Sequence, residues 1–119
     1  MADQGHNFGL EQWIIDLAGL AGEGQRRAFL SGQAQTQSKE AVESLYNAVV
    51  TFARVDLQKA EKLAQASSWI AEQLNDPYST AQSARAVGHV LYLTGKYQQA
   101  IQEYEKALAI FEQIGRAHV

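Results

Sequence analysis

Apolar residues recur at three- and four-residue spacing along most of the chain, with polar residues between them. This period predicts amphipathic helices, because a helix turns about 100° per residue and gathers such positions on one face. Valine and isoleucine seldom alternate strictly with polar residues, as they would in a half-buried strand. The pattern therefore predicts an all-α fold.

Turn and cap signals divide this pattern into about six helices. Ser38, Asp56 and Asp76 are suited to N-cap three of them, and Asn75 is suited to end one in the left-handed conformation. Pro77 fits a first helical position, where its missing N–H costs nothing. The predicted helices cover about 9–20, 24–31, 38–54, 57–74, 77–93 and 96–114, the last ending at Gly115.

Residues 39–78 repeat in residues 79–118 at an offset of 40 residues, which aligns small residues with small residues. Such residues let two helix backbones approach closely. We expect Tyr97, Tyr104 and Leu108 to fill the remaining space between the last two helices. The aligned small pairs are Ala48 with Gly88, Ala60 with Ala100 and Ser67 with Ala107.

These observations give a domain organisation. Residues 1–7 are mostly polar, and residues 1–8 are predicted to be a disordered lead-in. Residues 9–37 are predicted to form a capping helical hairpin, and residues 38–119 two hairpin repeats (38–76 and 77–116) with the start of a further helix. Because no polar capping helix follows the second repeat, we expect the chain to be an amino-terminal piece of a longer protein or a truncated form of one.

The second copy resembles the tetratricopeptide repeat through Gly88, Gly95, Tyr97, Ala100, Tyr104 and Ala107. The first copy departs from that pattern, with Val55 in place of the turn glycine. The resemblance implies a right-handed superhelix of antiparallel hairpins that binds other proteins. The 40-residue period exceeds the usual 34, and the carboxyl-terminal segment is similar to long-period bacterial multi-repeat proteins, some with a signalling or caspase-like peptidase domain.

In that family the first helix of each hairpin lines the concave side of the superhelix. The resemblance therefore implies that four residues of helix 77–93 contact a protein or peptide partner. Arg85 is suited to bind a carboxylate, and Tyr92 offers a ring with a polar tip. The alternative is a hydrated helix face without a ligand. The four residues are Gln82, Arg85, His89 and Tyr92.

The last helix carries an apolar face that no later helix covers. Dimerisation is the expected way to hide such a face. This gives an alternative function, that of a structural self-association module forming a homo-oligomer. The residues expected on the face are Ile101, Tyr104, Leu108 and Phe111.

Composition and motifs exclude several other functions. The net charge of −3 comes from interspersed charges, so no basic stripe is available for nucleic acid. No apolar run approaches the roughly 20 residues of a membrane span. The three histidines are far apart and cysteine is absent, so we expect no metal site. The sequence also lacks the pattern of a secretory signal, so we expect a cytoplasmic protein. It carries no catalytic or cofactor motif, so we expect that it is not an enzyme and holds no cofactor.

Overall fold

A computed structural model describes residues 10–117, which form six α-helices, one short 3₁₀ helix and no strand. The all-α prediction is confirmed for this part of the chain. The predicted lead-in falls on residues 1–8, outside the described residues. The elements are α1 (Gln12–Ala18), α2 (Glu23–Ser31), η2 (Ala34–Thr36), α3 (Lys39–Ala53), α4 (Leu57–Leu74), α5 (Pro77–Leu93) and α6 (Tyr97–Ala117).

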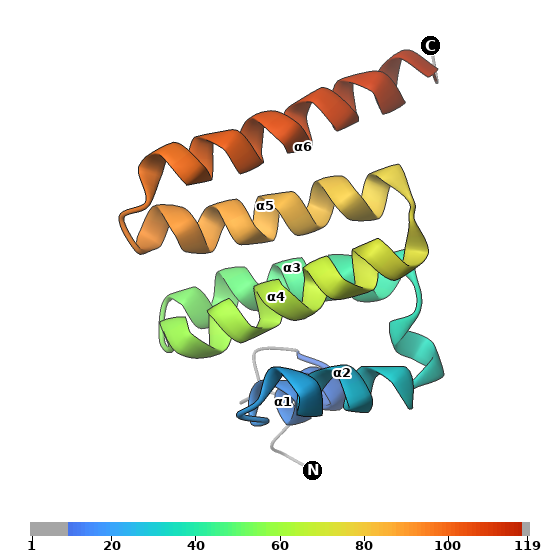
Figure 1. Cartoon of the computed structure of the whole chain (residues 1–119), viewed down its shortest axis with the longest axis vertical. Coiled ribbons are helices and arrows are strands. Elements are labelled where there is room, and N and C mark those ends of the chain that lie inside the picture. Colours follow the sequence, from blue (N-terminus) through green and yellow to red (C-terminus); the bar gives the residue numbers. More distant parts are fainter. Residues whose placement is uncertain (1–9, 118–119) are drawn as a thin grey trace.

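The helices form a layered stack (Figure 1). Helices α3 and α4 make one antiparallel hairpin, and α5 and α6 make the next. Helix α5 packs against both α3 and α4, whereas α6 packs against α5 at one end of the stack. Helices α1 and α2 pack on α4 at the other end, and side chains from α1 to α4 share one apolar core.

Side-chain caps start three helices where the sequence predicts them. The side chains of Ser38, Asp56 and Asp76 each accept a backbone hydrogen bond from the third residue onward, at 3.0 to 3.1 Å. The hydroxyl of Ser79 also donates to Asp76 at 2.8 Å, and this bond is the main reason why the pKa of Asp76 is lowered. Asn75 ends α4 in the left-handed conformation, with φ 52°.

The two helix-hairpin turns close differently. Gly95 takes a φ of +83°, and the Lys96 N–H reaches back to the carbonyl of Leu91 at 2.9 Å. Val55 replaces the glycine in the first turn, and a β-branched residue disfavours positive φ. There the Asp56 N–H bonds to Phe52 one residue nearer, at 2.6 Å. The departure of the first copy from the repeat pattern thus has a local consequence, but the hairpin still forms.

The predicted end of the last helix at Gly115 is wrong. Helix α6 continues to Ala117, so Arg116 and Ala117 extend α6 and do not start a further helix. Gly115 lies in the helix with no atom within 4 Å of its Cβ position, and Glu112 reaches Arg116 across it at 4.0 Å. A helical glycine costs about 1 kcal/mol relative to alanine, which does not by itself end a helix. Residues 118–119 lie outside the described residues.

Small residues form the contact between α5 and α6. Ala100 and Ala107 are buried, and a Cβ atom on Gly88 would lie 2.9 Å from the ring of Tyr104. Tyr104 therefore packs directly on the backbone of α5. Tyr97 and Leu108 do not fill this interface as expected, since they are 57% and 59% exposed. They lie at the exposed margin of the contact, where Tyr97 meets the ring of Tyr92 and Leu108 lines a depression with Arg85.

We expect Gly88→Ala to give no gain in stability, although alanine normally favours a helix interior by about 1 kcal/mol. The added Cβ would push against the Tyr104 ring and open the α5–α6 contact. Gly115→Ala is the matched control, because nothing lies within 4 Å of the added atom, and it should stabilise the protein. Urea denaturation of both variants measures the difference. Equal gains at the two positions would contradict the close contact.

Candidate functional site

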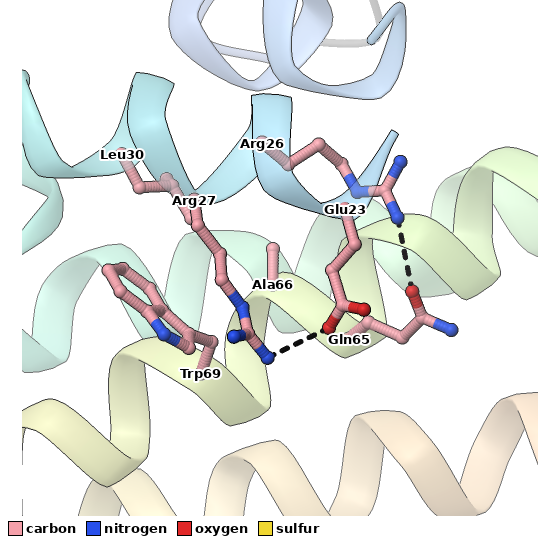
Figure 2. Close-up of a pocket in the computed structure, with 7 residues that line it drawn as sticks. All are labelled: Glu23, Arg26, Arg27, Leu30, Gln65, Ala66 and Trp69. Atoms are coloured by element: carbon pink, nitrogen blue, oxygen red, sulfur yellow. Dashed lines mark hydrogen bonds and ion pairs between the residues drawn. The ribbon is translucent and has the colours of Figure 1, made fainter. Parts of the chain in front are cut away.

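A small pocket lies between α2 and α4 (Figure 2). Glu23, Arg27 and Trp69 are among its lining residues, and its volume is only about 10 Å³. This is room for roughly one water molecule. Arg27 pairs with Glu23 at 2.9 Å and lies 6.0 Å from the centre of the Trp69 ring. The pocket is a packing defect between helices and is too small for a ligand.

Arg26 beside this pocket is a buried cation with a structural role. It is only 5% exposed, and its guanidinium donates to the carbonyls of Leu20 and Ala21, both at 3.0 Å. It also donates to the side-chain oxygen of Gln65 on α4 at 3.2 Å. A buried arginine with three acceptors fixes the α1–α2 turn to α4. Arg26 therefore joins the amino-terminal hairpin to the stack.

A polar relay connects α3 to α5. The Tyr78 hydroxyl donates to Glu43 at 2.9 Å and accepts from the Gln82 amide at 3.2 Å. The Gln82 oxygen in turn accepts from Arg85 at 2.7 Å. Burial, followed by the hydrogen bond to Glu43, raises the pKa of Tyr78. Gln82 is 4% exposed, so it supports its neighbours and does not offer its amide to a partner.

Arg85 ends this relay on a tyrosine of α3. Its guanidinium donates to the Tyr46 hydroxyl at 2.9 Å and lies 4.1 Å from the centre of that ring. Both contacts hold the cation in one place and leave further N–H donors available. Within residues 10–117, Arg85 makes no ion pair with a carboxylate. The site thus presents a positioned positive charge.

His89 and Tyr92 continue the same side of α5 beyond Arg85. Partial burial lowers the pKa of His89, so its imidazole is neutral at neutral pH and can both donate and accept. Tyr92 is 54% exposed and meets the ring of Tyr97 edge to face, with centroids 5.3 Å apart. The contact between Tyr92 and Tyr97 therefore makes the exposed surface of α5 continuous with that at the start of α6.

Arg85 and the apolar face of α6 are expected on two separate surfaces from the sequence, but they lie side by side in the structure. Arg85 lines a depression of about 350 Å³ together with Tyr104, Ala107, Leu108 and Phe111 of α6. Phe111 is partly buried and lies edge to face with Tyr78, with centroids 6.1 Å apart. Burial raises the pKa of Tyr104. A positive charge therefore borders an apolar surface.

Three residues of the site are absent from the sequence-based prediction. Glu43, Tyr46 and Tyr78 hold Arg85 and Gln82 in place, directly or through the relay. Tyr46 looks like one more apolar position of a helix that is apolar nearly all round, and Tyr78 looks like a first-turn residue. The packing of α5 beside α3 brings Tyr46 to Arg85 and Glu43 to Tyr78, whereas Tyr78 reaches Gln82 within α5.

Two other kinds of site have no counterpart in residues 10–117. No cluster of three or more histidine, aspartate or glutamate side chains in this range is placed to hold a metal ion. None of the helices described there is both long enough and apolar enough to cross a membrane.

Comparison with known proteins adds one match. A family model described as tetratricopeptide repeat matches residues 40–113, more than half of the chain. No curated protein and no solved structure matches the chain.

We expect Tyr46→Phe to lower the free energy of unfolding by roughly 1 to 2 kcal/mol, because it removes the hydrogen bond from a cation and keeps the ring. Tyr46→Leu should cost more, since it also removes the aromatic face below Arg85. Tyr92→Phe, at an exposed ring, should change little. Denaturant titration checks all three, and a Tyr46→Phe variant as stable as the parent would argue against this link.

Proposed function

The chain belongs to the tetratricopeptide repeat family, and we propose that its function is to bind another protein, without catalysis of its own. Domains of this family commonly mediate protein–protein interaction. Stacked hairpins support that role because they present side chains from successive helices on one continuous surface. Helices α3 and α5 lie side by side in this way.

We place the partner on the concave face, along α5, as the family resemblance implies. Arg85, His89 and Tyr92 would contact the partner, and Gln82 would hold Arg85. The observation that carries this proposal is a cation fixed by Tyr46 and Gln82 without a carboxylate of its own in residues 10–117. Such a group is pre-organised for a carboxylate or a carbonyl of a bound peptide.

Tyr92 extends this chemistry. An exposed tyrosine supplies a large apolar contact and a hydroxyl at low entropic cost. The partner segment that fits is a peptide with an acidic residue near Arg85 and an apolar residue near Tyr92. Neutral His89 between them suits a backbone amide or carbonyl of the peptide.

The wider setting of the domain is also part of the proposal. The shared core of α1 to α4 supports residues 9–37 as a capping hairpin, followed by repeats at 38–76 and 77–116. A long-period bacterial type, a larger signalling or peptidase-associated parent protein and a cytoplasmic location rest on the sequence resemblance alone.

Self-association is the second candidate function. The large apolar side chains left exposed on α6 favour it, because an exposed apolar stripe is costly for a monomer. The surface for this role is centred on α6, whereas the peptide contact is centred on α5.

Selection from a displayed random peptide library tests the peptide-binding role. We expect enriched peptides to carry an acidic residue, and Tyr92→Ala to weaken their binding at least about tenfold, or 1.4 kcal/mol. Gln102→Ala is the control, since Gln102 is exposed on the polar side of α6. Calorimetric titration measures the affinities. Enriched peptides that bind both variants equally well would place the site elsewhere.

A further inference from the structure

We propose that the occupant of the open α6 face is a second copy of the chain, which pairs with the first about a two-fold axis running along α6, so that the two α6 helices lie parallel. The contact surface is the α6 stripe, defined here as Tyr97, Ile101, Tyr104 and Leu108. This inference rests on the self-association proposed above as the second candidate function and specifies its geometry; it does not depend on peptide binding.

The α6 stripe is large and exposed. Its residues follow one another at four-, three- and four-residue spacing, so they lie on one side of the helix. Their exposed fractions are 57%, 53%, 39% and 59% in chain order. Isolated exposed apolar residues are ordinary, but a contiguous row of four marks an interaction surface.

The first hairpin carries smaller and more polar residues at the equivalent positions. Forty residues earlier, α4 carries Leu57, Glu61, Ala64 and Ser68 where α6 carries Tyr97, Ile101, Tyr104 and Leu108. Of these four residues of α4 only Ala64 is buried, and Glu61 is exposed. Within residues 10–117, the corresponding side of α6 is bulkier and more apolar than that of α4. It is therefore suited to a partner that packs on large side chains.

A two-fold pairing needs only one surface on each copy. Two α6 stripes that meet about a two-fold axis close on themselves and leave no stripe free for a third molecule. At the opposite end of the stack from α6 (Figure 1), Trp13, Leu17 and Leu30 of α1 and α2 are buried in the core that they share with α3 and α4.

Charges at the two edges of the stripe select the direction of pairing. Ala100 and Ala107, which are buried, lie on one side of Tyr104 around the helix, toward α5. Exposed Glu105 lies about a quarter turn to the other side. Arg85 on α5 borders the stripe beside Tyr104 and Leu108. The stripe therefore has an acidic edge and a basic edge at the same level.

A two-fold axis parallel to α6 places the acidic edge of one copy opposite the basic edge of the other. Glu105 then faces Arg85 of the partner subunit, and the same pair forms again on the other side of the axis. An antiparallel two-fold would set acidic edge against acidic edge and Arg85 against Arg85 of the partner subunit. Like charges at close range are unfavourable. Charge complementarity therefore favours parallel α6 helices.

Solution mass against concentration tests the dimer. We expect the parent protein to shift from monomer to dimer between about 1 µM and about 1 mM, the range of a modest interface. Leu108→Glu should remain monomeric throughout, because it places a charge in the stripe at an exposed position that folding does not need. Gln102→Glu adds the same charge on the polar side and should dimerise like the parent. A parent protein that stays monomeric, or a dimer that Leu108→Glu leaves intact, would overturn the proposal.

Single-cysteine cross-linking tests the direction, and the chain has no cysteine to interfere. In a parallel pair each stripe residue meets its own copy, so Ile101→Cys and Leu108→Cys should each form a disulfide dimer alone under mild oxidation. Gln102→Cys should not. An antiparallel pair would cross-link only when the Ile101→Cys and Leu108→Cys proteins are mixed, and that result would refute the parallel arrangement.

Discussion

The close approach of α5 and α6 is the contact on which the rest of the second hairpin depends. It requires a residue without a side chain at Gly88, because the Tyr104 ring occupies the space that a Cβ would need. The first hairpin makes the corresponding approach with Ala48, Ala60 and Ser67, all fully buried. Helix α5 also lies against both α3 and α4. Side chains of the two hairpins therefore meet on one face.

That face combines fixed polar groups with exposed apolar ones. The relay from Glu43 to Arg85 uses hydrogen bonds to hold a cation at the border of the α6 surface. Rigid polar groups reduce the entropy that binding costs, while the neighbouring aromatic and aliphatic side chains supply area to bury. The proposed peptide along α5 and the proposed second copy along α6 would both place a carboxylate at Arg85, so they would compete for this cation.

Local rules in the sequence predict most of the fold but only part of the site. Helix caps depend on residues nearby in the chain, and the structure confirms those at Ser38, Asp56 and Asp76. It also confirms that the aligned small residues are buried. The predicted helix end at Gly115 is wrong, because glycine often ends a helix but here lies inside α6. Glu43 and Tyr46 lie on α3, and only the packing of α3 against α5 brings them to Tyr78 and Arg85. Tyr78 and Gln82 are four residues apart on α5, so their hydrogen bond is local.

The central claim is that, within residues 10–117, α5 is the neighbour that holds α6 in the stack. Native-state hydrogen exchange on a dilute sample tests this most directly, since a helix packed on one side opens at lower free energy than one packed on several. The account predicts faster exchange of the α6 amides than of those in α4 and α5, with α6 slowing as concentration rises. Protection of α6 equal to that of α4 in dilute solution would contradict it.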